Sequence, residues 1–195
     1  YMMGLQLSDP IPPVVMRLGT TRGTNALITR AGARTALVTS RGFGDVLEIG
    51  YQNRPHLFEL TVRKPQPLYE SVVEIAERVT VEGEVLTAPT EHVIRSQLAE
   101  LRTSGIESVA ICLLHSYAHP AHEQLVARIA REVGFREISA SNEVAPLTKI
   151  VARGDTTVVD AYLNPVLGHY LRGLRQQLPG SELRILSSAG GLVSA

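Results

Sequence analysis

Apolar and polar positions alternate along the chain in a rhythm that predicts strands and helices in turn. In the first third, strands are expected over residues 14–18 and 35–40, with a helix near 25–30 between them. A proline-rich stretch, 51–70, predicts an extended excursion, and the alternation over 71–79 is typical of a strand. This part of the chain is therefore predicted to consist of successive β–α units.

The middle of the chain predicts a pair of parallel strands. Apolar residues at helical spacing indicate helices over 90–105 and 120–134, and mostly apolar runs over 106–114 and 135–140 indicate strands. A strand, a helix and a strand in this order join parallel neighbours through a right-handed crossover. We therefore expect an α/β protein with a mixed, partly parallel sheet and flanking helices.

The longest amphipathic pattern lies in the last third of the chain. Apolar residues from 158 to 178 keep to one helical face, and Asp155 or Thr156 is expected to cap the start of this helix. Pro165 lies inside it and removes the hydrogen bond to the carbonyl of Ala161, so that a kink or two abutting helices are expected. A strand over 183–187 and a glycine turn follow.

Composition and charge narrow the class of protein. Of 195 residues, 44% are hydrophobic and 19% are charged, and the formal net charge is zero. A nucleic-acid partner is not expected, because such proteins usually carry a basic excess. A membrane is not expected either, because no apolar run reaches spanning length and no signal peptide opens the chain. The single cysteine, Cys112, predicts a buried thiol and fits a reducing, cytoplasmic setting.

A turn dense in hydroxyl groups and glycine follows the first predicted strand. It offers main-chain N–H groups, hydroxyls and an amide near the start of a helix, a good place to hold an anion or a polar small molecule. The alternative is that a threonine here simply caps the helix. The polar side chains concerned are those of Thr20, Thr21, Thr24 and Asn25.

Three histidines lie within eight residues after the buried strand of the middle region. His115 ends that strand, where open α/β sheets place ligands, and His119 and His122 follow. The cluster raises the possibility of a metal site, but Glu123 is the only carboxylate nearby, and satisfied or capping histidines are the alternative. No metal site is predicted, and His115 is kept as a candidate polar ligand of a substrate.

Arg153 precedes the long helix and could donate a forked pair of hydrogen bonds to a carboxylate or phosphate, with a surface salt bridge as the alternative. The loop cations Arg41 and Arg54 carry the same two interpretations. Gly190 and Gly191 could let the main chain approach a phosphate, or could form a plain tight turn. A nucleophilic triad is not supported, and no catalytic residue is assigned.

Ordered blocks across nearly the whole chain resemble the hydantoinase A / 5-oxoprolinase family. No single block is diagnostic, but their joint order and spacing is highly specific. The blocks are Gly19-Thr20-Thr21 with Thr24-Asn25-Ala26-Leu27, Gly32-Ala33-Arg34-Thr35-Ala36-Leu37-Val38-Thr39, Arg41-Gly42-Phe43 with Asp45, Gln52-Asn53-Arg54-Pro55, Lys64-Pro65 with Pro67-Leu68, Glu77-Arg78-Val79, Gly83-Glu84-Val85-Leu86, His115-Ser116-Tyr117 with Pro120 and His122-Glu123, Ser141 with Glu143 and Pro146, Arg153-Gly154-Asp155-Thr156-Thr157, Asp160-Ala161-Tyr162-Leu163 with Pro165, and Gly190-Gly191-Leu192.

The resemblance implies ATP-dependent opening of a cyclic amide, 5-oxo-L-proline or a hydantoin, with ATP and Mg²⁺ as cofactors of the parent enzyme. It also implies an RNase-H-like architecture of the actin, Hsp70 and sugar-kinase group. Related members are subunits of ATP-dependent ketone carboxylases. On this basis the substrate-binding residues are predicted to be Thr20, Thr21, Thr24, Asn25, His115 and Arg153, and the nucleotide-binding residues Gly190 and Gly191.

Two departures from the family pattern qualify this expectation. The Asp-Gly-Gly-Thr phosphate loops are absent, and Ala189 replaces the usual Asn or Asp before Gly190. The chain, whose two ends look cut, is therefore expected to be a segment between the two loops that binds no nucleotide alone. Its expected partners are the remainder of the same polypeptide or a second hydantoinase subunit, and a homo-oligomer is compatible with it.

Two domains are predicted, an N-terminal α/β region over 1–150 and the start of the hydantoinase A domain over 151–195. The rival functions are a non-catalytic assembly or regulatory module and a ketone-carboxylase subunit. Because phosphate loops would have to flank this segment in frame, the neighbouring coding sequence separates an enzyme segment from a standalone module.

Overall fold

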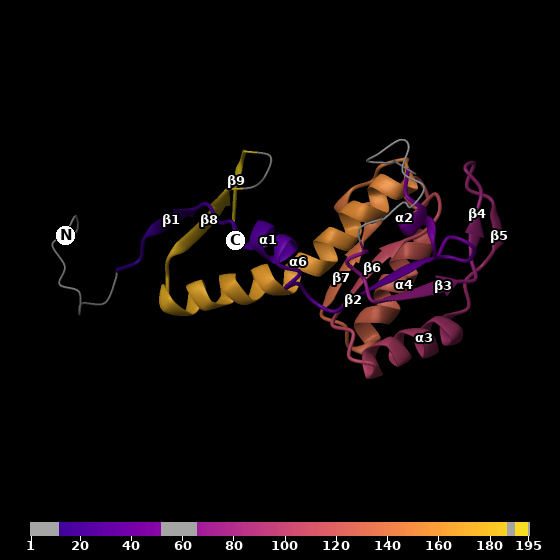
Figure 1. Ribbon diagram of the computed structural model, residues 1–195, viewed down its shortest axis with the longest axis horizontal. Helices are drawn as coiled ribbons and strands as arrows, with labels where there is room; N and C mark the ends of the chain where they lie inside the picture. The colour runs from indigo at the N-terminus through magenta and orange to yellow at the C-terminus, as the bar shows by residue number, and fades with distance from the viewer. Residues whose placement is uncertain (1–11, 52–65, 187–189, 195) are drawn as a thin grey trace, which may run out of the picture. The chain divides into compact units, whose positions relative to one another are not determined.

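The computed structural model describes residues 12–51, 66–186 and 190–194 (Figure 1). The chain forms two compact units. The small unit comprises Tyr1–Ala31 with Val166–Ala195, and the large unit comprises Gly32–Pro165. The domain boundary expected at 150/151 coincides instead with the start of a long helix, and the assignment of the two family domains stays a prediction.

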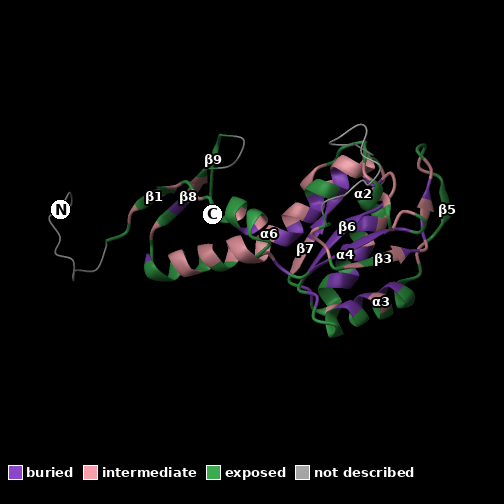
Figure 2. Ribbon diagram, viewed as in Figure 1, coloured by how far each residue is buried: buried purple, intermediate pink, exposed green. Residues whose placement is uncertain are grey.

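The large unit is built on a four-stranded sheet in which every neighbouring pair is parallel, as the strand–helix–strand rhythm predicts. The two central strands are buried along their whole length, which explains their mostly apolar composition (Figure 2). The strand order is β3 (Ser71–Ile75), β2 (Thr35–Ser40), β6 (Ser108–Cys112) and β7 (Glu137–Ala140).

Helices cover both faces of this sheet. On one face α3 (Glu91–Thr103) and α4 (Ala121–Val133) pack their apolar stripes on the strands, in a core that includes Leu98 and Ile129. On the other face the first part of α6 (Ile150–Gln177) contributes Val158 and Ala161 to a second cluster with Leu37 and Cys112. The predicted α/β class with a partly parallel sheet and flanking helices is confirmed.

Three short elements complete the large unit. A two-stranded antiparallel hairpin is formed by β4 (Arg78–Val79) and β5 (Val85–Thr87). Single-turn helices follow β2 and β7, namely α2 (Val46–Ile49) and α5 (Ser141–Val144).

The small unit contains a three-stranded sheet in the order β1 (Val15–Leu18), β8 (Glu182–Leu186) and β9 (Leu192–Ser194). β1 and β8 are parallel, and β9 is antiparallel to β8. The helix α1 (Arg22–Ile28) follows β1. The Arg22 guanidinium lies over the Tyr170 ring of α6, 4.2 Å from its centroid.

Two predictions about elements were wrong. The strand expected over 71–79 is divided into β3 and β4, because the chain turns at Glu77, whose N–H donates to the carbonyl of Ile75. The long helix begins at Ile150 rather than at Asp155, so Asp155 and Thr156 cap nothing and lie within it. Thr156 instead donates its hydroxyl to the carbonyl of Ala152 in the preceding turn.

The helix α6 continues past Pro165 as one helix, so the expected pair of abutting helices is not found, and the alternative, a kink at Pro165, stays a prediction. Residues 52–65 of the proline-rich excursion, which include Arg54, lie outside the described residues, as does Ser187 at the end of the last predicted strand. All helices in the described part of the chain, α6 included, lack the apolar stretch that a membrane span requires.

Candidate functional site

The hydroxyl-rich turn and the glycine pair lie at the carboxyl end of the parallel strands β1 and β8 in the small unit's sheet. β1 and β8 are parallel, with Leu18 opposite Ile185, so the segments that follow the two strands leave the sheet at the same edge. Leu192, which follows Gly191, pairs with Leu186 at the end of β8. The structure therefore brings together two of the predicted groups, the residues of the turn after β1 and the Gly190-Gly191 pair.

Most polar side chains in this turn remain exposed. The Thr20 hydroxyl accepts a hydrogen bond from the N–H of Arg22 at 3.2 Å, so the capping alternative holds in part for this residue. Thr21 occupies the cap position but makes no side-chain capping bond. Thr24 and Asn25 lie within α1 and are exposed. Three side chains of the predicted set are thus accessible to a ligand.

In the large unit, a buried carboxylate binds the segments that follow the strands β6 and β7. Glu123 is 0% exposed, and its Oε1 accepts hydrogen bonds from the Leu113 N–H at 2.8 Å and from the Ser116 and Ser141 hydroxyls at 2.8 and 2.6 Å. Its Oε2 accepts from the N–H of Asn142 at 2.9 Å. Burial raises the pKa of the Glu123 carboxyl, and these hydrogen bonds oppose the shift.

Arg153 completes this network from the first turn of α6. It is 0% exposed, and it donates from Nε to the Ser141 hydroxyl at 3.0 Å and from its two terminal nitrogens to the carbonyls of Leu147 and Leu113 at 2.7 and 2.6 Å. Ser141 thus links the guanidinium to the Glu123 carboxylate. The surface salt bridge considered for Arg153 is not found. The side chain is fully buried, and its partners are the Ser141 hydroxyl and two main-chain carbonyls.

The turn held by this network presents His115. Glu123 and Arg153 bind the N–H and the carbonyl of Leu113, and His115 follows in the left-handed region with a φ of 59°. A non-glycine residue is held there only when its surroundings compensate for the strain. The His115 ring meets the Tyr117 ring edge-on at 6.1 Å, and the Arg153 guanidinium lies 5.4 Å from the centre of the same ring.

The other two histidines point elsewhere. His119 Nε2 lies 3.0 Å from the carbonyl oxygen of Val81, and His122 Nδ1 lies 2.7 Å from the buried Oε2 of Glu77. The hydroxyl of Ser40 donates to the other oxygen of Glu77. The described residues contain no group of three side chains placed to bind a metal.

Sequence reasoning missed the central role of Glu123, which was considered only as a neighbour of the histidines. A signal was present: Glu123 stands three, four and seven residues before Val126, Ala127 and Ala130, on the buried face of its helix. A carboxylate at such a position needs several donors. Cys112 behaves as predicted, since it is 2% exposed and burial raises the pKa of its thiol.

The predicted site residues thus fall into two groups. Thr20, Thr21, Thr24 and Asn25 belong to the small unit together with the glycine pair, and His115 and Arg153 belong to the large unit.

Comparison with known proteins identifies the class. Residues 8–134 match the hydantoinase/oxoprolinase N-terminal region, and the chain belongs to this family. A 5-oxoprolinase of Saccharomyces cerevisiae is 42% identical over 208 residues, which cover 91% of this chain but 16% of the yeast protein. The chain therefore spans about a sixth of the length of such relatives.

Two further relatives broaden the comparison. The crystal structure of an ATP-dependent caprolactamase from Pseudomonas jessenii has a TM-score of 0.77 and 30% identity, covering 89% of this chain and 26% of the other. The acetophenone carboxylase gamma subunit of Aromatoleum aromaticum is 31% identical over 83% of this chain and 24% of the subunit.

Proposed function

We propose that this chain is a segment of an ATP-dependent enzyme that opens a cyclic amide, 5-oxo-L-proline or a hydantoin. The observation that carries the proposal is the parallel pairing of β1 and β8, because the exposed hydroxyl-rich turn and the glycine pair both lie at the carboxyl end of these two strands. Support comes from the yeast 5-oxoprolinase, 42% identical across 91% of this chain. An RNase-H-like architecture for the parent enzyme belongs to the same proposal.

The chemistry explains why such an enzyme would need ATP. An amide carbonyl is a poor electrophile, and phosphorylation of its oxygen creates a leaving group and an activated carbon for attack by water. Phosphoryl transfer depends mainly on positioning, on cations and on a metal ion. In this proposal the hydroxyls of Thr21 and Thr24 and the amide of Asn25 bind the polar edge of the ring or its carboxylate, and Gly190 and Gly191 leave room for a phosphate.

The donor set at this edge fits phosphate oxygens better than it fits Mg²⁺. Hydroxyls and main-chain N–H groups suit an anion, whereas Mg²⁺ is usually held by carboxylates and waters. Within the described residues of the small unit the one carboxylate is Glu182, which begins β8 at the far end of the strand and pairs with Arg184. The carboxylate ligands of the metal would therefore come from outside this group of residues.

The large unit contributes differently to the proposal. His115 is partly exposed at the end of its strand and is a candidate to contact the substrate. Arg153 has all three guanidinium nitrogens engaged by protein groups, so we assign it the role of positioning the His115 turn.

The proposal is tested with the polypeptide that carries this chain, assayed for ATP-dependent hydrolysis of 5-oxoproline. Thr21→Val removes an exposed hydroxyl at nearly constant volume, and we expect kcat/KM to fall about tenfold or more, because one hydrogen bond to a charged or activated group is lost. Thr103→Val, on α3 of the large unit, is the matched control and should leave kcat/KM unchanged. Equal activity of Thr21→Val and the parent protein would remove Thr21 from the site.

A second candidate is a subunit of an ATP-dependent ketone carboxylase, favoured by the 31% identity to the acetophenone carboxylase gamma subunit. Carboxylation of a ketone in the presence of ATP and bicarbonate, without 5-oxoproline hydrolysis, would support it. Absence of both activities, together with a neighbouring coding sequence that lacks phosphate loops, would support the third alternative, a non-catalytic assembly or regulatory module.

A further inference from the structure

The sheet of the large unit has an uncovered edge at β3. β3 pairs with β2 on one side, and no strand in the described part of the chain pairs with it on the other. An edge of this kind presents main-chain N–H and C=O groups that can accept another strand. The strand is five residues long, a usual length for a sheet strand.

This edge lacks the features that commonly protect edge strands. Its sequence, Ser-Val-Val-Glu-Ile, contains no proline, glycine or lysine. Its one charged side chain, Glu74, is turned back and accepts hydrogen bonds from the N–H groups of Gly42 and Gly44 at 3.0 and 2.8 Å. Val72 is 39% exposed. Apart from the carbonyl of Glu74, which the Gln97 side chain engages, the edge is therefore open, and it is partly apolar.

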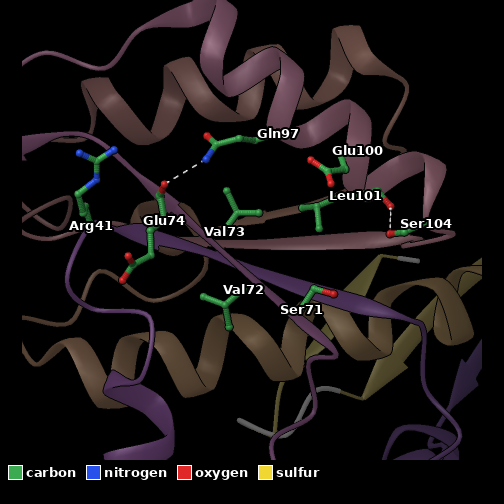
Figure 3. A pocket seen from close by; sticks show the side chains of 9 residues that line it. All are labelled: Arg41, Ser71, Val72, Val73, Glu74, Gln97, Glu100, Leu101 and Ser104. Atoms are coloured by element: carbon green, nitrogen blue, oxygen red, sulfur yellow. Dashed lines mark hydrogen bonds between the residues drawn. The ribbon is translucent and has the colours of Figure 1, made fainter.

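A groove runs along the edge, between β3 and α3 (Figure 3). Its volume is about 600 Å³, and four consecutive residues of β3, from Ser71 to Glu74, line it. From α3 the Gln97 amide nitrogen donates to the carbonyl of Glu74 at 3.4 Å, while its Oε1 is buried and has no partner among the described residues.

Opposite charges stand on either side of the middle of the groove. Figure 3 shows Arg41 beyond the Glu74 end and Glu100 on the other side of Val73. Both side chains are exposed, and no ion pair within the described residues engages either of them. A two-fold axis through Val73 would exchange the two ends and bring Arg41 of one copy next to Glu100 of the other.

We propose that β3 pairs antiparallel with β3 of a second copy of this chain, which joins the two sheets into one across a two-fold axis. The occupant of the groove is the same strand from the other copy, so the interface is self-complementary, as in most homodimers. Val73 faces its own counterpart, and β-branched pairs of this kind stabilise adjacent strands. Two symmetric Arg41–Glu100 contacts set the register.

The test is a charge exchange, read out by sedimentation velocity of the purified full chain across a concentration series. Arg41→Glu and Glu100→Arg each place like charges together twice, and each should raise the dimer dissociation constant about tenfold or more. The double variant, Arg41→Glu with Glu100→Arg, restores opposite charges and should return the constant to near the parent value. Arg136→Glu, an exposed charge before β7, is the matched control and should have no effect.

Circular dichroism and thermal unfolding verify that each variant is folded. If a charge variant does not fold, disulfide cross-linking of separate cysteine variants tests the same interface. Val73→Cys should form a disulfide-linked dimer on mild oxidation, faster than Val93→Cys on the exposed face of α3. The proposal is overturned by a chain that stays monomeric at high concentration, by single exchanges without effect, by a double variant that is not restored, or by equal cross-linking of the two cysteine variants.

Discussion

At the scale of single residues, Glu123 has the largest expected effect on stability. Replacing it by alanine leaves the N–H groups of Leu113 and Asn142 and two hydroxyls without their acceptor in a buried site. We expect Glu123→Ala to lower the free energy of unfolding by about 3 kcal/mol or more, since each unsatisfied buried donor is costly. Urea unfolding at several pH values measures this loss.

The loss should depend on pH in a defined direction. Because the folded-state pKa of Glu123 is raised above its ordinary value of 4.5, the folded protein holds a proton that the unfolded chain releases. The stabilisation that Glu123 gives through this pKa shift is therefore complete below pH 4.5 and is lost as the pH rises through the folded pKa. The difference in free energy of unfolding between the parent protein and Glu123→Ala should narrow over the same rise in pH.

Glu132 serves as the opposite case for this prediction. Its pKa is lowered, first by the hydrogen bond from Arg95, so its contribution is present above pH 4.5 and is lost as the pH falls through the folded pKa. The difference in free energy of unfolding between the parent protein and Glu132→Ala should widen from acid toward neutral pH. The same trend for both variants would contradict the assignment of Glu123 as a group with a raised pKa.

At the scale of elements, the end of α4 depends on a left-handed residue. Gly134 has a φ of 102°, and a Cβ there would meet no atom within 4 Å, so the cost of a side chain is purely conformational. We expect Gly134→Ala to lower the free energy of unfolding by about 1 kcal/mol.

The control for Gly134 is Gly173, which lies inside α6 with helical geometry and also has open space around it. Gly173→Ala should stabilise its helix by about 0.5–1 kcal/mol, because alanine has the higher helix propensity. Hydrogen exchange of α4 and α6 separates the two effects. Slower exchange in both variants would show that Gly134 is not needed at the end of α4.

At the scale of the whole molecule, we expect the chain alone to bind no ATP at micromolar concentration. The sequence has no Asp-Gly-Gly-Thr loop, and the carboxylate of Glu182 lies at the wrong end of its strand to help a metal ion at the glycine pair. Isothermal titration calorimetry with ATP and Mg²⁺ measures this directly, with the longer polypeptide as the positive control. Micromolar binding by the chain itself would contradict the expectation.

Much of the fold could be predicted because it is encoded locally. The strand over 35–40 and the helices α3 and α4 follow from runs and stripes of apolar residues whose period matches the element. The division of 71–79 into β3 and β4 could not be predicted, because the apolar alternation continues through the turn at Glu77, and the contacts of its buried carboxylate with Ser40 and His122 join residues distant in sequence.

The candidate site residues were chosen from the sequence by residue type and stay a prediction, whereas their arrangement could not be predicted. Residues such as Thr21 and His115 stand out by type and by their place after a strand. The burial of Arg153 and its link through Ser141 to Glu123 could not be seen, because a charged side chain gives no sign in the sequence of which carbonyls it will meet.

By itself, the sequence determined the family, the α/β class and the elements whose apolar period is regular, since these depend on short-range pattern and on residue order. Only the tertiary structure decided that Glu123 and Arg153 hold the His115 turn, that the turn after β1 and the glycine pair share an edge, and that β3 is left open. These features arise from strand order and from burial, where residues far apart in the chain compete for the same hydrogen bonds.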